Sequence, residues 1–464
     1  MPPTPSAALL RHSATALLRR SPLPHHALRL SRALAPFHTS PAPRLAAPAA
    51  AQKQLQRPIA VKLPSGEEKE IPTRWLRDHC HCAECVNQDT LQRSFDSFTN
   101  TDKTPQNVTS KEDGLEVTWQ ETGHKSFFPW EWLATNIAKK PSAPKYAFWG
   151  AEIAKSPPAV HYDEIMASDA GVGKWTAKIR EHGFCFVDGC PVSPQKTEDL
   201  LNRIAFIRET HYGAFYDFTS DLTMKDTAYT TLALPAHTDT TYFTDPAGLQ
   251  LFHLLSHTGT GGASLLVDGF ACASQMRSSH PEAYDILSRV PVPWHASGNE
   301  GVVITPAAWV PVFTLDGEGA VRQLRWNNDD RASMPVEVAE GVGYEEWFEA
   351  ARVWNSIITD KKNEYWEQLV PGRPVIFDNW RVMHARSAFE GKRRMCGGYI
   401  NRDDFVSRLV PVTSTAPVPV VAVVPVGAVV VAFTPNLVPV TVGAPLCIVH
   451  VFAHALSSNP PPYA

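Results

Sequence analysis

The stretch Ala236-His237-Thr238-Asp239-Thr240-Thr241-Tyr242-Phe243 contains a His-x-Asp pair, and His384 lies far downstream as a candidate third partner. Two histidines and one carboxylate on one face of a metal are typical of non-heme Fe(II) oxygenases, which keep other positions open for O₂ and a co-substrate. In a strand, residues i and i+2 point to the same side, so one strand edge can direct both side chains at one ion. The chain has 18 His and 47 acidic residues, so such a pair also arises by chance on an exposed turn, and the pair alone leaves both alternatives open.

The sequence around this pair has the pattern of a β-rich domain. Apolar runs bounded by glycine or proline turns predict buried strands at 248–253, 263–269 and 374–378. In a further strand expected from residue 393 onward, Arg393 and Arg394 must point to opposite faces, so only one of them can point inward. An inward arginine suits the far carboxylate of 2-oxoglutarate, the common co-substrate of these oxygenases, because a guanidinium binds a carboxylate with two parallel hydrogen bonds.

Several longer motifs resemble the trimethyllysine dioxygenases, whose sister family is the γ-butyrobetaine dioxygenases. The resemblance covers roughly residues 58–409 and is carried, in order along the chain, by residues 208–221, 226–230, 237–243, 259–270, 384–393 and 399–404. It implies a mainly β fold, in which a double-stranded β-helix (jelly roll) with flanking helices forms the catalytic domain. A small β-rich zinc-binding domain is expected to precede it.

The resemblance also implies an iron site and its co-substrates. Fe(II) would be held by the residues that match the family's ligands, His237, Asp239 and His384. The 2-oxoglutarate arginine matches Arg393 rather than Arg394, because the family sets its distance from the tyrosine that matches Tyr399. The expected co-substrates are 2-oxoglutarate and O₂, with ascorbate keeping the iron reduced.

A trimethylammonium substrate would need aromatic rings, because this permanent cation has no N–H group to donate and favours ring faces. The resemblance places substrate contacts at an acidic residue, an amide and four tyrosines: Asp226, Asn327, Tyr212, Tyr216, Tyr229 and Tyr399. Taken without the resemblance, each tyrosine is better explained as an ordinary core aromatic with a satisfied hydroxyl. Asp226 is equally consistent with a turn or helix cap.

Three of the eight cysteines fall in one short run, Cys80, Cys82 and Cys85. In a reducing compartment this spacing favours a metal over a disulfide, and thiolates suit a tetrahedral structural Zn²⁺. The family supplies a fourth ligand that matches His124, whereas His79 and His81 are local rivals. The other alternative is a set of unliganded cysteines.

The implied activity is C3 hydroxylation of N6,N6,N6-trimethyl-L-lysine to 3-hydroxy-trimethyllysine, the first step of carnitine biosynthesis. One alternative is γ-butyrobetaine hydroxylation on the same fold. Another, of a different class, is a non-catalytic zinc-binding interaction protein. The sister enzyme suggests a homodimer, by analogy only.

The two ends of the chain differ in composition from the rest. Residues 1–66 contain arginines but no Asp or Glu, which predicts a mitochondrial transit peptide over 1–57 and a location in the matrix; a disordered Pro/Ala-rich tail is the alternative. Residues 410–464 form an uncharged Val/Pro-rich tail that lies outside the family motifs. Its frequent prolines argue against a membrane-spanning helix.

We therefore expect a zinc-binding domain at 58–135, a linker at 136–170 and the oxygenase domain at 171–409. A helix near Lys174–Glu181, a strand at Phe184–Val187 and an inserted helix at Tyr344–Asp360 are expected within the oxygenase domain. The net charge of −4 and the lack of a basic stripe argue against a nucleic-acid partner. No membrane partner is expected either.

Overall fold

The computed structural model describes residues 57–137, 145–219, 230–297 and 301–413. The chain divides into two compact units after Ser142, and each unit is described here by itself. Two predicted substrate residues, Asp226 and Tyr229, lie outside the described residues, as do almost all of the expected transit peptide and almost all of the expected tail. Within the described ranges, no helix is both long and apolar enough to span a membrane.

The first unit is built from a β-hairpin, a three-stranded antiparallel sheet and two short helices. Apolar residues from all of these elements, such as Val61, Leu76, Val117 and Leu133, share one core. The elements are β1 (Ile59–Lys62), β2 (Glu68–Ile71), α1 (Thr73–Asp78), β3 (Pro105–Ser110), β4 (Gly114–Trp119), β5 (Lys125–Pro129) and α2 (Trp130–Ile137). The unit therefore has its own small hydrophobic core.

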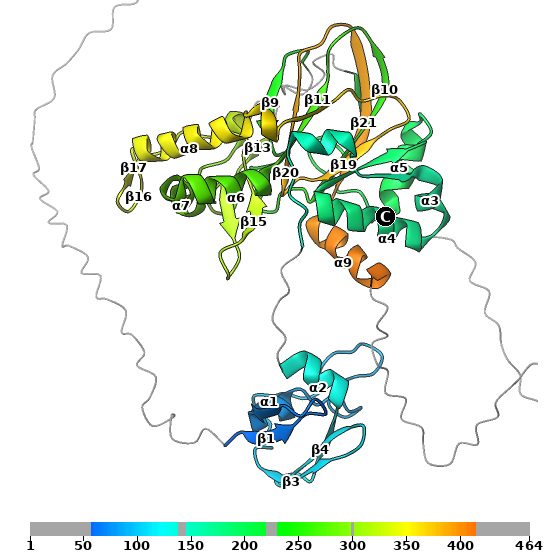
Figure 1. Ribbon diagram of the computed structural model, residues 1–464, viewed down its shortest axis with the longest axis vertical. Helices are drawn as coiled ribbons and strands as arrows, with labels where there is room; N and C mark the ends of the chain where they lie inside the picture. Colours follow the sequence, from blue (N-terminus) through cyan, green and yellow to red (C-terminus); the bar gives the residue numbers. More distant parts are fainter. Residues whose placement is uncertain (1–56, 138–144, 220–229, 298–300, 414–464) are drawn as a thin grey trace, which may run out of the picture. The chain divides into compact units, whose positions relative to one another are not determined.

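The second unit is a jelly roll of two facing sheets (Figure 1). The larger sheet has the order β6-β7-β19-β10-β21-β8, and the smaller has the order β18-β11-β20-β9. The bounds in the larger sheet are Ala159–His161 (β6), Phe184–Asp188 (β7), Val375–Asp378 (β19), Leu249–Thr258 (β10), Lys392–Ile400 (β21) and Phe215–Thr219 (β8). The bounds in the smaller sheet are Tyr365–Glu367 (β18), Ser264–Asp268 (β11), Val382–Arg386 (β20) and Leu234–His237 (β9). The predicted fold class is confirmed.

The period-2 pattern of β10 assigns its two faces. Leu249 and Leu251 pack into the core beneath the helices that cover the larger sheet. Phe252 and Gln250 point the other way and line a cavity. Because β10 occupies a central position in its sheet, its inward residues reach the interior of the jelly roll.

Helices cover the outer face of the larger sheet. They are α3 (Tyr162–Ala167), α4 (Asp169–His182), α5 (Pro194–Asn202) and α9 (Arg402–Thr413). Buried residues such as Trp175 and Ile179 of α4 pack against Ile376 and Ile400 of the sheet. The expected helix near Lys174–Glu181 is thus part of α4, and β7 follows it as expected.

A second helical layer, formed by α6 (Gly269–Ser279), α7 (Pro281–Arg289) and α8 (Tyr344–Ile358), lies at one end of the sheets (Figure 1). The inserted helix expected at Tyr344–Asp360 is confirmed as α8, whose Trp347 and Trp354 are buried in the largest core. Short ribbons surround these helices: β12 (Ala296–Ser297), β13 (Val303–Ile304), β14 (Phe313–Leu315), β15 (Val321–Leu324), β16 (Glu337–Ala339) and β17 (Val342–Gly343). Three 3₁₀ turns complete the described structure: η2 (Ala151–Lys155), η4 (Asn328–Asp330) and η5 (Lys361–Asn363).

The segment expected as a linker contributes to the second unit. Its strand β6 joins the edge of the larger sheet in parallel with β7. The fully buried Arg381 forms an ion pair with Asp268 at 2.7 Å and donates a hydrogen bond to the main-chain oxygen of Ala147 at 2.8 Å. Residues 145–167 are therefore anchored to the jelly roll, because Val160 and Ile165 are buried and Arg381 binds the backbone that precedes them.

Candidate active site

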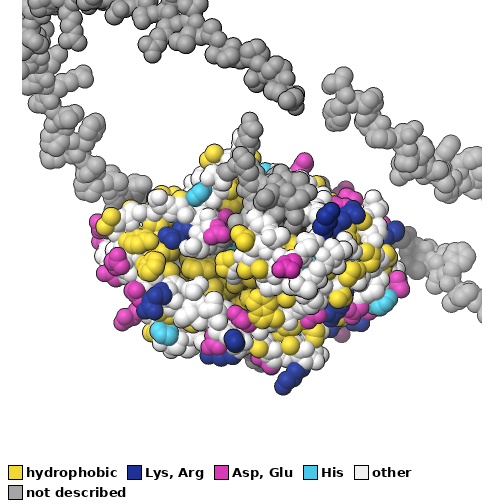
Figure 2. Space-filling model, turned by 90° about the horizontal axis from the view of Figure 1, so that it is seen from above, with side chains coloured by type: hydrophobic (Ala, Val, Ile, Leu, Met, Phe, Trp, Pro, Cys, Tyr) yellow, Lys and Arg dark blue, Asp and Glu magenta, His cyan; other side chains and the backbone are white. Residues whose placement is uncertain are grey.

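A cavity of about 300 Å³ lies between the two sheets. Its lining comes from both sheets and from the segments after β9 and β15. The residues that the following argument uses are Tyr212, Tyr216, His237, Asp239, Gln250, Asn327, His384, Arg386, Arg393 and Tyr399. Figure 2 shows one face of the molecule, on which hydrophobic side chains gather and charged side chains of both signs are scattered around them.

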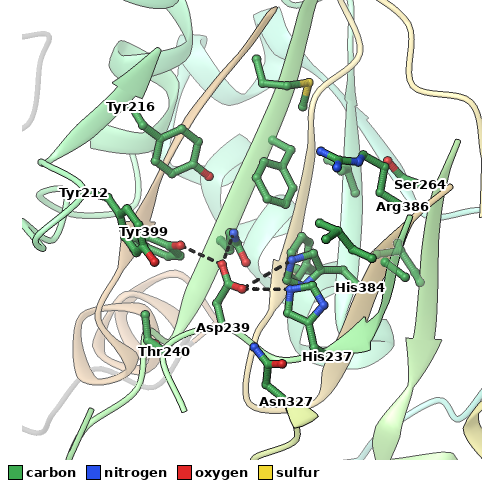
Figure 3. Close-up of a pocket in the computed structure, with 18 of the residues that line it drawn as sticks. Tyr212, Tyr216, His237, Asp239, Thr240, Ser264, Asn327, His384, Arg386 and Tyr399 are labelled. Atoms are coloured by element: carbon green, nitrogen blue, oxygen red, sulfur yellow. Dashed lines mark hydrogen bonds and ion pairs between the residues drawn. The ribbon is translucent and has the colours of Figure 1, made fainter. Parts of the chain in front are cut away.

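The structure brings His237, Asp239 and His384 together at one point of this cavity (Figure 3). The Nε2 atoms of His237 and His384 lie 3.3 and 3.7 Å from Oδ1 of Asp239. One donor atom from each residue lies within 4.8 Å of the others. Two imidazole nitrogens and one carboxylate oxygen at this separation fit a single Fe(II).

The two His-x-Asp residues do not share a strand, which differs from the sequence expectation. The strand β9 ends at His237, and Asp239 follows in a turn. There Thr240 adopts a φ of +56°, a left-handed conformation that is unfavourable for a β-branched residue. The side-chain amide of Asn379 holds this turn, because it accepts from the main-chain N–H of Asp239 at 2.8 Å and donates to its carbonyl at 2.9 Å.

The surroundings of the two histidines leave ring nitrogens available for a metal. Nδ1 of His237 lies 2.8 Å from the main-chain oxygen of Pro235 and donates to it, which directs Nε2 toward the metal position. Burial alone would lower the pKa of His237, but the adjacent Asp239 outweighs burial and raises it. Burial lowers the pKa of His384 to about 3, with the neighbouring His237 adding to the effect. Burial opposes ionisation of Asp239, but the two histidines and a hydroxyl outweigh it, and the pKa of this carboxyl is lowered.

The two adjacent arginines of β21 point to opposite faces of the strand. The side chain of Arg393 lines the cavity and is only 6% exposed, and no hydrogen bond or ion pair joins it to another described residue. Burial, together with the nearby Arg386, lowers the pKa of Arg393 to about 10. By contrast, Arg394 points outward and binds Asp217 at 2.8 and 2.5 Å. An inward guanidinium with no carboxylate partner in the described structure fits an incoming carboxylate such as that of 2-oxoglutarate.

Three of the predicted cage tyrosines, Tyr212, Tyr216 and Tyr399, lie across the cavity from the two histidines (Figure 3). The rings of Tyr216 and Tyr399 meet edge to face with centroids 5.8 Å apart. A Cβ atom at Gly397 would clash with the main-chain oxygen of Leu251 and lie 2.9 Å from the Tyr216 ring, so glycine leaves room for both the paired strand and this ring. The predicted polar contact Asn327 also lines the cavity.

Sequence reasoning did not identify three residues of the site, Asn379, Gln250 and Arg386. The guanidinium of Arg386 donates to the main-chain oxygens of Thr230 and Leu232 at 2.7 and 2.8 Å. Because Arg386 follows His384 by two residues in β20, the strand period could have indicated that both share one face. Nothing in the local sequence marks Asn379 or Gln250, since their roles depend on contacts made far along the chain.

The first unit contains a second cluster of possible metal ligands, formed by Cys80, Cys82, Cys85 and His124. The three sulfurs lie 3.4, 3.6 and 3.5 Å from Nε2 of His124, in the order of the sequence. The carboxylate of Glu84 lies 3.1 Å from Nδ1 of His124 and can fix the orientation of this ring. Three thiols and one imidazole fit a tetrahedral Zn²⁺.

The rival His79 is engaged elsewhere, because its Nδ1 lies 2.8 Å from the main-chain oxygen of Trp75. The other rival, His81, packs edge to face against Trp132. Neither of them belongs to the cluster.

The jelly roll, the metal triad and the inward arginine together define a non-heme Fe(II)- and 2-oxoglutarate-dependent oxygenase. Residues 138–399 match the model of the taurine catabolism dioxygenase TauD, TfdA family, and residues 51–134 match that of the γ-butyrobetaine hydroxylase-like N-terminal domain. The chain is 49% identical to trimethyllysine dioxygenase of Neurospora crassa, over 76% of this chain and 83% of the relative. The protein belongs to the TauD/TfdA dioxygenases and, within them, to the trimethyllysine dioxygenase family.

Two further relatives place the chain within this group. Mitochondrial trimethyllysine dioxygenase of Homo sapiens is 38% identical, with 72% of this chain and 80% of the relative covered. The γ-butyrobetaine dioxygenase of a Pseudomonas species is 31% identical, with 82% of this chain and 99% of the relative covered. The expected family is confirmed, and the expected sister family is the more distant of the two.

Proposed function

We propose that the protein hydroxylates C3 of N6,N6,N6-trimethyl-L-lysine in an Fe(II)- and 2-oxoglutarate-dependent reaction, the first step of carnitine biosynthesis. Tyr212, Tyr216 and Tyr399 form an aromatic wall in the cavity. The observation that carries this proposal is that this aromatic wall and the metal triad face each other in one cavity of about 300 Å³. A ligand that bridges them would have a quaternary cation at one end and its reacting carbon at the other. The names of the relatives at 49% and 38% identity support this substrate.

In this proposal, His237, Asp239 and His384 hold the iron, and Arg393 binds the far carboxylate of 2-oxoglutarate. Bound iron supplies the activation of O₂, coupled to the conversion of 2-oxoglutarate to succinate and CO₂, that hydroxylates an unactivated C–H bond. The low pKa of His384 keeps its imidazole neutral and able to bind a metal. Arg393 lies in a buried environment, where its ion pair with a carboxylate is weakly screened.

Recognition of the substrate cation rests on the aromatic wall. Tyr212, Tyr216 and Tyr399 are proposed to offer ring faces to a trimethylammonium group, and each good cation–π contact contributes about 0.5–2 kcal/mol. We assign Tyr229 and Asp226 to the same subsite on the strength of the family motif. Asn327, which lines the cavity, is proposed to bind the polar end of the substrate.

The remaining assignments follow from the same family. We propose that Cys80, Cys82, Cys85 and His124 bind a structural Zn²⁺ in a domain at 58–135, followed by an oxygenase domain that extends to residue 409. Ascorbate is proposed to keep the iron reduced. We further propose a transit peptide at 1–57, a location in the mitochondrial matrix, a homodimer, and a tail at 410–464 that does not form part of the fold. The human relative is named mitochondrial, which supports the mitochondrial part of this location.

The test compares succinate release from 2-oxoglutarate with trimethyllysine, γ-butyrobetaine and plain lysine as substrates, using His237→Ala as the control. We expect release with trimethyllysine that the substitution abolishes. Release mainly with γ-butyrobetaine would keep the chemistry but overturn the substrate. A folded, iron-loaded protein with no substrate-dependent release would instead favour the zinc-binding interaction protein.

A further inference from the structure

The two carboxylate oxygens of Asp239 have different surroundings. Oδ1 faces the imidazoles of His237 and His384, at 3.3 and 3.7 Å from their Nε2 atoms. Oδ2 accepts two hydrogen bonds, each of 2.7 Å, from the side-chain amide of Gln250 and the hydroxyl of Tyr399 (Figure 3). One oxygen is thus presented to a metal while the other is held by donors.

The register of the larger sheet places these two donors side by side. Gln250 of β10 is the direct cross-strand partner of Tyr399 of β21. Side chains of such a pair lie on the same face, with Cβ atoms about 4.5–5.5 Å apart. Both residues are buried in the cavity wall, with 1% and 5% exposure, so their hydrogen bonds to Asp239 lie in a largely desolvated environment.

The orientation of the Gln250 amide is fixed by the same contact. Its Nε2 atom donates to Asp239, while its Oε1 atom has no partner among the described residues. Turning the amide would place a carbonyl oxygen against a carboxylate oxygen, which is repulsive. The amide therefore acts as a donor to Oδ2.

The main chain of Asp239 is also held, through the two hydrogen bonds to Asn379 described above. Backbone and carboxylate are thus restrained independently, by β10 and β21 on one side and by the turn after β19 on the other. Rotation of the carboxylate about its Cβ–Cγ bond would break both hydrogen bonds to Oδ2. Charge-assisted hydrogen bonds of this kind are stronger than neutral ones.

We propose that Gln250 and Tyr399 are positioning residues that restrict Asp239 to binding iron through Oδ1 alone. This inference rests on the iron site of the proposed function. A carboxylate can bind a metal through one oxygen or through both. Binding through both would take a position that this ligand set otherwise leaves open for 2-oxoglutarate or O₂.

The proposal gives Tyr399 two roles. Its ring meets Tyr216 in the aromatic wall, and its hydroxyl holds an iron ligand. Removing the hydroxyl alone, by Tyr399→Phe, keeps the ring and isolates the second role. Gln250→Met isolates the other donor, because methionine has a similar length but no N–H group.

The matched control is Tyr216→Phe. This substitution also removes a tyrosine hydroxyl from the same cavity, but that hydroxyl donates to the main-chain oxygen of Leu251 at 2.7 Å and not to an iron ligand. Two quantities are measured for each variant of the full-length protein. The first is the dissociation constant for Fe(II) without oxygen or any substrate, and the second is the ratio of succinate released to hydroxylated product.

We expect Tyr399→Phe and Gln250→Met each to weaken Fe(II) binding about 10- to 100-fold, the usual effect of losing a partner of a metal ligand. The ratio of succinate to product should rise in both, while Tyr216→Phe should bind Fe(II) as the parent does. Parent-like Fe(II) affinity in the folded variants would overturn the proposal, and if one variant does not fold, the other decides. Because Fe(II) affinity is measured without substrate, an unreactive parent protein would refute the proposed function, and the Fe(II) affinities alone would then decide this proposal.

Discussion

His384 lies directly opposite His237 in the antiparallel register of β20 and β9, although the two residues are far apart in the sequence. Their rings are 4.3 Å apart between centroids. Each strand supplies one imidazole, so the two imidazoles come together only when β20 and β9 pair. The metal site is therefore a product of the smaller sheet, while the arginine and the donors to Asp239 come from the larger one.

The adjacent arginines of β21 provide the first prediction. Replacing Arg393 with leucine should raise the KM for 2-oxoglutarate about 10- to 100-fold, because hydrogen bonds between charged groups contribute about 1.5–3 kcal/mol each. Arg394→Leu is the matched control, since this residue forms an exposed ion pair with Asp217, and such pairs contribute little. Initial rates at varied 2-oxoglutarate concentrations would give the KM of each variant. Equal increases in the KM for the two substitutions would contradict the assignment of Arg393 as the 2-oxoglutarate arginine.

The aromatic wall provides the second prediction. Tyr216→Leu should raise the KM for trimethyllysine about 2- to 30-fold, which corresponds to the loss of one cation–π contact. The KM for 2-oxoglutarate should not change. A neutral analogue that carries a tert-butyl group in place of trimethylammonium should be insensitive to the substitution, and an equal loss of affinity for the two compounds would argue against a cation–π contact.

The cysteine cluster provides the third prediction. The purified protein should retain zinc, and His124→Ala should release it and lower the melting temperature, because a structural zinc site stabilises the fold that contains it. His79→Ala is the control, since this side chain binds the carbonyl of Trp75. Metal analysis after dialysis measures the difference. Loss of zinc from His79→Ala with retention in His124→Ala would mean that the fourth ligand is wrong.

A buried histidine outside the iron site provides the fourth prediction. Burial lowers the pKa of His253 to about 4, and the ring is held by Thr197 at 2.7 Å and by the main-chain N–H of Gly372 at 3.1 Å. The unfolded chain protonates this histidine near its ordinary pKa of about 6.5. Stability from neutral His253 is thus fully present above that pH and is lost as the pH falls toward 4.

By this linkage, His253 should account for about 2 kcal/mol of the stability lost between pH 7 and pH 5. His253→Gln should reduce the pH dependence of the urea midpoint over this interval. The comparison is made between parent and variant at each pH, so other titrating groups cancel. Parallel pH profiles for the two proteins would contradict the prediction.

Much of the catalytic unit could be predicted from local sequence pattern and family motifs. The helix α8 follows from the spacing of Trp347 and Trp354, and the strand alternation separates Arg393 from Arg394. The jelly roll and the roles of the metal ligands followed from the family motifs, because composition and period alone do not specify how strands pair.

Other features depend on contacts between distant residues and could not be predicted. The turn that presents Asp239 needs Asn379, and the fixed carboxylate needs the register between β10 and β21. The expected linker at 136–170 contains β6 and α3, and β6 pairs with β7. The buried Arg381 also binds the backbone of Ala147, a tertiary contact that local composition does not reveal. Asn379 and Arg381 are polar and buried, and no local sequence pattern marks them.

The central claim is that one cavity combines the metal triad with a cage for a trimethylated lysine. The most direct measurement is the reaction of the purified protein with trimethyllysine, Fe(II) and 2-oxoglutarate under oxygen-18 gas, followed by mass and NMR analysis of the product. The account predicts a hydroxylated product that carries one oxygen-18 atom at C3, formed together with succinate. A product hydroxylated at another carbon, or succinate formed without any hydroxylated trimethyllysine, would contradict it.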